Sequence, residues 1–125
     1  MSKTAVVVFS DPRAGGEEAL GRLFNAMLLT LELKEKERHV ELIFQGAGTR
    51  WPAEVTKPEH PAHALYHAVA DKVSGVCGGC ADVFGATEAA RATGLPLVRE
   101  KEIAGTTGVI DLSRYLDEGY RLVTF

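Results

Sequence analysis

The stretch Ala5-Val6-Val7-Val8-Phe9 is a continuous apolar run dominated by β-branched valine. Such a run predicts a strand that is covered on both faces, as in a parallel sheet. The residues that follow, 10–16, include a proline and two glycines and therefore predict a loop. Apolar residues then recur at helical spacing and predict a helix over residues 17–36, after which residues 39–44 return to strand character. A strand, a helix and a second strand in this order predict a right-handed parallel crossover.

The alternation of helix and strand continues to the end of the chain. The further segments are predicted as an irregular connection (46–60), a helix (62–71), a strand (72–76), a turn (77–80), a helix (81–93), a short strand (95–99), a glycine-rich break (105–108), a helix (111–118) and a strand (120–125). This order predicts an α/β protein: one domain, 1–125, of three-layer α/β/α, flavodoxin-like build around a five-stranded, mainly parallel sheet. The predicted core consists of Val6, Val8, Leu23, Phe24, Met27, Leu42, Phe44, Val69, Val76 and Leu122.

The composition excludes several classes of protein. Of the 125 residues, 46% are hydrophobic and 25% are charged, which is ordinary for a globular chain. The net charge of −3 offers no basic surface, so neither a nucleic acid nor a membrane is expected as a partner. The apolar run 5–9 is too short for a signal peptide, and no stretch reaches the roughly 18 apolar residues of a membrane span. A cytoplasmic location is therefore expected, where two cysteines are more often catalytic, redox-active or metal-binding than joined in a structural disulfide.

The sequence Cys77-Gly78-Gly79-Cys80 lies where a predicted strand ends and a helix begins. Sites in open α/β sheets form outside the carboxyl ends of the strands, and N–H groups at a helix start favour the thiolate of Cys77. Cys77 is therefore predicted to emerge at the sheet edge, with a pKa below the roughly 8.5 of a free cysteine. Cys80 is predicted to be partly covered, and Gly78 and Gly79 to let the backbone approach a ligand closely. The alternatives are a reversible disulfide, half of a zinc site, or two small residues that only pack at a turn.

Two other groups of residues are expected at the same edge of the sheet. Ser10, Asp11 and Arg13 follow the first strand, and Arg13 is a candidate for holding an anionic sulfur species or lowering a thiol pKa. The alternative is an ordinary polar loop in which Asp11 caps the next helix. The connection 46–60 contains Trp51, which is interpreted as loop packing in preference to a lid or an interface anchor.

Three histidines stand near the predicted third helix: His60, His63 and His67. His63 and His67 are i,i+4 neighbours, so a metal site shared with the cysteines is conceivable, but a solvated face is the preferred interpretation. One C-x-x-C pair supplies two ligands where a closed zinc site needs four, so no tightly bound metal is expected. A phosphate loop is missing as well, and no cofactor is expected.

With these residues placed, nearly the whole chain resembles the DsrE family of small sulfur-handling proteins, which includes the TusD-type sulfur-relay subunits. The matching segments are Val6 to Gly16, Leu23 to Leu28, Gly75-Val76-Cys77, Cys80-Ala81, Phe84-Gly85 and the ending Glu118 to Phe125. The resemblance implies that Cys77 matches the single persulfide-carrying cysteine of the relay members. It also implies a homo-oligomer, a trimer or a hexamer.

The chain departs from the relay members at two places. Cys80 stands where they usually have a small residue, and the C-x-x-C-A pattern is similar to a branch of relatives with two cysteines. The loop before the last helix, which carries a histidine in that branch, reads Gly105-Thr106-Thr107-Gly108 here. A second thiol at Cys80 allows a persulfide on Cys77 to be resolved into a disulfide.

Two hypotheses follow for the function. The first is a sulfur-carrier or thiol-redox protein, in which Cys77 is the persulfide-forming nucleophile, Cys80 assists or resolves, and the partner is a sulfur donor or acceptor protein. Whether it is an enzyme, a sulfurtransferase or a thiol oxidoreductase, stays open. The second is a non-enzymatic module that binds a small ligand or a metal through the C-x-x-C pair. A flavin- or nucleotide-binding domain is suggested by the fold alone.

Overall fold

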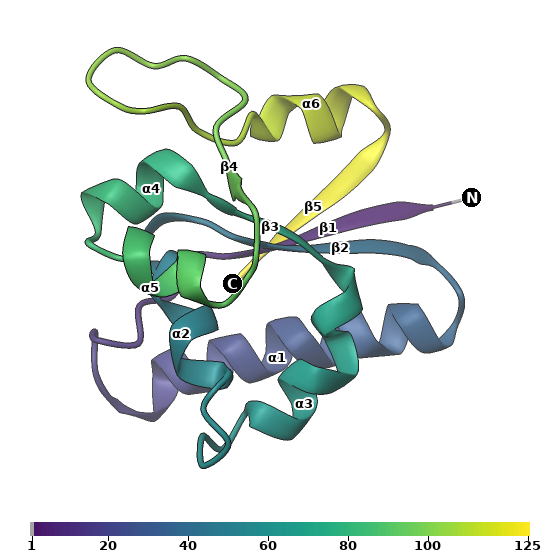
Figure 1. Ribbon diagram of the computed structural model, residues 1–125. Coiled ribbons are helices and arrows are strands. Elements are labelled where there is room, and N and C mark those ends of the chain that lie inside the picture. Colours follow the sequence, from purple (N-terminus) through teal and green to yellow (C-terminus); the bar gives the residue numbers. More distant parts are fainter. Residues whose placement is uncertain (1) are drawn as a thin grey trace.

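Five parallel strands in the order β4-β3-β2-β1-β5 form the centre of the computed structural model, which describes residues 2–125 (Figure 1). The strands are β1 (Lys3–Val8), β2 (His39–Phe44), β3 (Val73–Cys77), β4 (Leu97–Val98) and β5 (Tyr120–Thr124). The helices are α1 (Gly16–Glu35), α2 (Trp51–Val55), α3 (His63–Val69), α4 (Gly78–Val83), α5 (Thr87–Ala92) and α6 (Leu112–Asp117). All four strand pairings are parallel, so the predicted α/β class and five-stranded sheet are confirmed.

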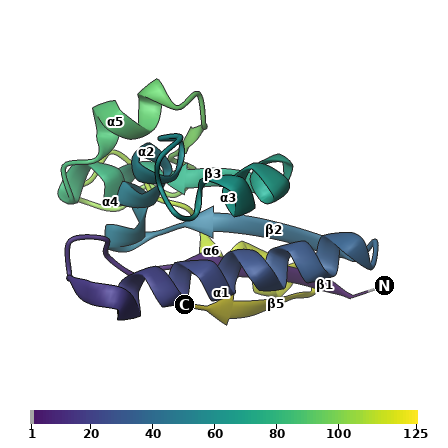
Figure 2. The same ribbon diagram turned by 90° about the horizontal axis from the view of Figure 1, so that it is seen from below.

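The helices cover the two faces of the sheet unequally (Figures 1 and 2). α1, α2 and α3 lie against one face, and α6 lies against the other, while α4 and α5 stand at the carboxyl ends of the strands. The larger hydrophobic core, on the α1 face, holds eight of the ten predicted core residues fully buried. Phe24 is half-buried at its margin, and Leu122 packs on the smaller core of the α6 face. Among residues 2–125, no helix has the length and apolar character needed to cross a membrane.

The predicted single helix over residues 81–93 is wrong, because the chain forms two short helices there. α4 starts earlier, at Gly78, so the expected turn 77–80 is its first turn. It ends where Gly85 adopts a φ of 67° and the N–H of Ala86 donates to the carbonyl of Ala81 at 2.7 Å. This is a glycine-terminated helix end that reverses the chain before α5.

The connection 46–60 is more regular than predicted. A 3₁₀ turn at Gly46–Arg50 runs directly into α2, and the predicted helix 62–71 is split into α3 and a 3₁₀ turn at Ala70–Lys72. Trp51, the first residue of α2 in this connection, is buried, and its indole N–H donates to the carbonyl of Ser10 at 2.8 Å. The packing interpretation of Trp51 is therefore confirmed, and Trp51 is not an anchor on the surface.

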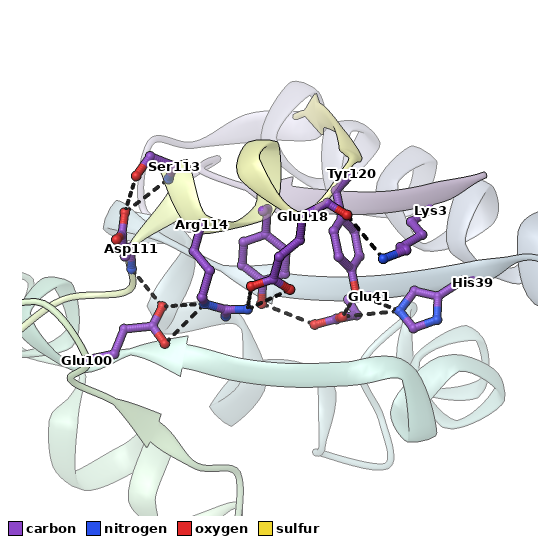
Figure 3. Close-up of polar contacts among 10 residues, drawn as sticks. Lys3, His39, Glu41, Glu100, Asp111, Ser113, Arg114, Glu118 and Tyr120 are labelled. Carbon is purple, nitrogen blue, oxygen red and sulfur yellow. Dashed lines mark hydrogen bonds and ion pairs between the residues drawn. The ribbon is translucent and has the colours of Figure 1, made fainter. Parts of the chain in front are cut away.

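A polar cluster fastens α6 to the sheet at the amino ends of the strands (Figure 3). The hydroxyls of Tyr115 and Tyr120 both donate to the carboxylate of Glu41, the former at 3.1 Å, and His39 Nε2 lies 3.3 Å from the same carboxylate. Burial opposes ionisation of Glu41, but these hydrogen bonds outweigh it and lower the pKa of Glu41. The position of α6 over the sheet is thus fixed by a charged group and not only by apolar packing.

Candidate functional site

Cys77 is the last residue of β3 and the residue immediately before α4. Its neighbour across the sheet is Val98 of β4, so both stand at the carboxyl edge of the parallel strands. This is the edge at which sites form in open α/β sheets. Cys80 follows in the first turn of α4, and both cysteines are free thiols.

The two thiols have opposite ionisation behaviour. The pKa of Cys77 is lowered to about 6, first by a hydrogen bond from the Cys80 thiol and then by the backbone N–H groups of Ile110, Cys80 and Gly79, which together outweigh the effect of burial. The pKa of Cys80 is raised, first by the neighbouring Cys77 and then by burial, although the N–H of Gly46 works against this. At neutral pH the pair therefore consists of a thiolate at Cys77 and a protonated thiol at Cys80. The predicted low pKa of Cys77 agrees with this geometry.

The expectation that the Cys77 side chain emerges at the sheet edge is wrong. Cys77 is 0% exposed, and Cys80 is the more accessible of the two. Cys77 belongs to the smaller core of the α6 face, together with Ile43, Ile110 and Tyr115. The physical reason is the alternation of side chains along β3: Val76 points into the larger core, so Cys77 points to the opposite face, which the segment before α6 covers.

Gly78 and Gly79 allow a close approach, but the group that approaches is the chain itself. A Cβ atom on Gly78 would lie 2.5 Å from Cγ of Arg99, and one on Gly79 would lie 2.7 Å from Cγ1 of Val109. The N–H of Gly79 also donates to the carbonyl of Gly108 at 2.8 Å. The space above both glycines is therefore filled by the segment that follows β4.

Ser10, Asp11 and Arg13 lie in the loop after β1, as predicted, and the structure adds Arg50 to this group. Nη1 of Arg50 donates to both oxygens of Asp11, at 3.0 and 2.9 Å, while the backbone N–H of Arg13 donates to Asp11 at 2.9 Å. Burial by itself would raise the pKa of Asp11, but the hydrogen bonds from Arg13 and Arg50 outweigh this effect, and the pKa is lowered. The side chain of Arg13 is exposed and borders a surface cavity of about 180 Å³ together with Arg50 and Glu54.

Arg50 links the loop after β1 to the end of α4. Its Nε donates to the carbonyl of Phe84 at 3.1 Å, and its guanidinium stacks on the Phe84 ring at 5.5 Å. This role of Arg50 could not be predicted from the sequence, because Arg50 is separated from Asp11 by 39 residues and from Phe84 by 34. The arginine that organises this loop is therefore Arg50, and not the predicted Arg13.

The histidines are held by local contacts. Nδ1 of His60 accepts a hydrogen bond from the N–H of Ala62 at 3.0 Å, and Nδ1 of His63 lies 2.9 Å from the carbonyl of Val55. His67 is exposed and stacks edge-on against His63. Within residues 2–125, no three side chains of histidine, cysteine, aspartate or glutamate come together as metal ligands.

A second polar group near the cysteines was not found from the sequence. The carboxylate of Asp82, on α4, accepts a hydrogen bond from Arg99 Nη1 at 3.0 Å and another from the hydroxyl of Thr107. The hydroxyl of Thr107 in turn accepts a hydrogen bond from Arg99. The three residues are distant in sequence and carry no motif, so only the fold brings them together.

A parallel α/β sheet with a thiolate and a neighbouring thiol at its carboxyl edge defines a small thiol protein of α/β type. The chain belongs to the DsrE/DsrF-like family, whose model matches residues 3–125. This membership confirms the resemblance seen in the sequence and supports a sulfur-related role.

Known proteins similar to this chain come from archaea and bacteria. The chain is 30% identical over 101 residues to MJ0733, an uncharacterised protein of Methanocaldococcus jannaschii. The matched region covers 81% of this chain and 78% of MJ0733. The fold is similar to the ychN protein of E. coli, with a TM-score of 0.64, 21% identity and 100% of both chains covered. It is also similar to the conserved protein BT1422 of Bacteroides thetaiotaomicron, with a TM-score of 0.63, 16% identity and coverage of 98% and 95%. At these identities the two structures show the fold alone.

Proposed function

We propose that the protein is a sulfur carrier or thiol-redox protein, with Cys77 as the nucleophile that forms a persulfide and Cys80 as the thiol that assists or resolves it. The observation that carries the proposal is the placement of two free cysteines at the carboxyl edge of the sheet, Cys77 at the end of β3 and Cys80 in the first turn of α4. Their environment agrees with it, because it lowers the pKa of Cys77 and raises the pKa of Cys80. The thiolate is the form of cysteine that attacks sulfur, and its N–H donors stabilise negative charge on sulfur. Family membership supports a sulfur-related role.

The first step is the capture of sulfur. The Cys77 thiolate attacks the outer sulfur of a donor persulfide, a bond forms between Cys77 Sγ and that sulfur, and the donor's own S–S bond breaks. The donor leaves as a thiolate. One S–S bond replaces another, so this step needs no external oxidant or reductant.

The second step has two outcomes. In one, the thiolate of an acceptor takes the outer sulfur and Cys77 returns to its thiolate. In the other, Cys80 attacks Sγ of Cys77, a Cys77–Cys80 disulfide forms, and the outer sulfur leaves as hydrosulfide with the proton of Cys80. The two cysteines are then oxidised by two electrons, the sulfane sulfur is reduced to sulfide, and an external dithiol must reduce the disulfide before the next cycle.

The partners and assembly follow from the same proposal. A sulfur donor or acceptor protein meets the chain at the carboxyl edge of the sheet. The working unit is a homo-oligomer, a trimer or a hexamer, as the resemblance seen in the sequence implies. Trp51 does not contribute to that interface because it is buried within one chain. Light scattering at micromolar concentration measures the mass, and a monomer would contradict the assembly.

The sulfur chemistry is tested by intact mass after incubation with polysulfide in the absence of reductant. The Cys80→Ser variant is expected to gain sulfur and to keep it, because its resolving thiol is missing. The wild type is expected to release sulfide and to lose two hydrogens as the disulfide forms. Cys77→Ser is the matched control and is expected to gain no stable sulfur. Equal sulfur gain by Cys77→Ser and Cys80→Ser would exclude Cys77 as the persulfide carrier.

A further inference from the structure

Residues 99–110, called the cover below, connect β4 to α6 and lie over the first turn of α4 (Figure 1). The cover contacts the cysteine site through its backbone. Ile110 is buried in the same small core as Cys77, and the carbonyl of Gly108 accepts from the N–H of Gly79 at 2.8 Å. With the cover in place, Cys77 is 0% exposed.

This burial conflicts with reaction at Cys77. Attack on a donor persulfide requires the donor sulfur to approach Cys77 in line with the bond that breaks, and a sulfur enclosed on all sides leaves no room for it. The absence of side chains on Gly78 and Gly79 lets Arg99 and Val109 pack directly on α4. The glycines of α4 and the larger side chains of the cover together produce the closed arrangement in which Cys77 is buried.

The cover contains a hairpin, residues 101–109, that can move as a unit about a base that stays in place. Lys101 and Val109 exchange two backbone hydrogen bonds of 2.9 Å, which makes a small hairpin whose tip, residues 102–107, is exposed. At the base, Glu100 accepts from the N–H of Asp111 at 2.8 Å and from Arg114 Nε at 3.5 Å (Figure 3). A hairpin tip with few buried contacts belongs to the part of a protein that opens at low free-energy cost.

One carboxylate connects this tip to α4. Asp82 accepts hydrogen bonds from Arg99, which directly follows β4, and from Thr107, at the end of the hairpin tip. Thr107 first, then Thr87 and Arg99, lower the pKa of Asp82 to about 2, so the carboxylate is ionised throughout the neutral range. The side chains of Asp82 and Arg99 are 32% and 28% exposed, so solvent or a docking molecule reaches them while Cys77 is covered.

We propose that the cover is a gate over Cys77, and that Asp82 is the positioning residue that holds the gate shut through Arg99 and Thr107. Opening moves the hairpin, residues 101–109, away from α4 and frees the side of Cys77 on which Val109 packs, while Ile110 stays with the base. The gate is relevant to sulfur transfer only if the proposed function is correct. Its test uses a small alkylating reagent and no sulfur donor, so the gate and the proposed function can fail separately.

The experiment measures the alkylation rate of Cys77 in a Cys80→Ser background, where it is the only thiol. The rate is followed against pH, and the plateau at which Cys77 is fully ionised is compared, which removes any difference in pKa. Asp82→Asn removes the negative charge that pairs with Arg99, and Thr107→Val removes the hydroxyl that donates to Asp82. Each is expected to raise the plateau roughly three- to tenfold, because each weakens the contact that closes the gate. Asp71→Asn is the matched control, since it breaks the ion pair with Lys34 at 2.8 Å, away from the cysteines, and is expected to leave the plateau unchanged.

Gly79→Ala opens the gate by a different route, because its Cβ would lie 2.7 Å from Val109 and must displace the cover. It is expected to raise the same plateau without changing any charge. Hydrogen exchange separates opening from unfolding: in all three variants the amide of Gly79 is expected to lose protection while the amides of β1 and β2 keep it. Plateaus that match the parent in all three variants overturn the gate. A rise that comes with equal loss of protection in β1 and β2 also overturns it.

Discussion

Replacing Cys80 with alanine is expected to raise the pKa of Cys77 from about 6 toward the roughly 8.5 of a free cysteine. The Cys80 thiol is the largest of the groups that lower this pKa, and alanine has no donor to replace it. The N–H groups of Ile110 and Gly79 remain, so we expect a rise of about one to two units and not a full return. At pH 7 a shift from 6 to about 8 reduces the thiolate fraction from about nine tenths to about one tenth.

The measurement is the ultraviolet absorbance of the thiolate as a function of pH, which does not require a reagent to reach the buried sulfur. Cys80→Ser is the matched control, because a hydroxyl still donates a hydrogen bond to Cys77 and should hold part of the shift. Cys77→Ser is expected to lose the transition near pH 6 altogether. A midpoint near 6 that persists in Cys80→Ala would show that the backbone donors alone set the pKa.

The same change has a consequence for stability. The pKa of Cys77 in the folded protein lies below its value in the unfolded chain, so between about pH 6 and 8.5 the unfolded chain binds one more proton. The free energy of unfolding of the wild type should therefore rise with pH across this window, by about 1.4 kcal/mol per unit for a full proton, and the gain is lost as pH falls through 6. In Cys80→Ala the folded and unfolded pKa values of Cys77 lie closer together. The free energy of unfolding should therefore rise over a narrower pH range and by a smaller amount.

The fold was largely predictable because the spacing of apolar residues along the chain indicates the order of its strands and helices. A valine run at 5–9 and a second strand at 39–44, separated by a helical pattern, determine a parallel crossover, and the structure has that arrangement. The end of α4 was also encoded locally, since Phe84-Gly85 is a recognisable helix stop. The helix over 81–93 was predicted as continuous because four alanines and a glutamate follow Gly85 and favour a helix beyond the break.

The position of the candidate site was predictable, but its enclosure was not. A cysteine at the junction of a strand and a helix indicates the carboxyl edge of the sheet, and this holds for Cys77. Cys77 is buried with Ile110 and Val109, and the segment that carries them contacts α4 through Arg99 and Thr107, which bond Asp82 from 17 and 25 residues away in the chain. Contacts of this kind are set by the path of an irregular segment, for which hydrophobic periodicity gives no information.

The largest loss of stability from a single methyl group is expected at Gly48. This residue lies in the 46–50 turn, which crosses the end of β1, and an added Cβ would lie 2.2 Å from the carbonyl oxygen of Val8. That oxygen already accepts a hydrogen bond from the N–H of Gln45 at 2.9 Å, which holds it in place. The added Cβ, fixed to the backbone of Gly48, would therefore clash with the backbone of Val8. Gly48→Ala is therefore expected to lower the free energy of unfolding by about 2–3 kcal/mol, as overpacking does in a filled core.

Gly21→Ala is the control, because it makes the same chemical change where nothing lies within 4 Å of the new Cβ. Gly21 is in the interior of α1 with an ordinary helical φ, so alanine should raise the free energy of unfolding by about 0.5–1 kcal/mol. Urea denaturation of both variants measures the two opposite shifts. A Gly48→Ala protein as stable as the wild type would mean that the 46–50 turn does not rest on β1 as described.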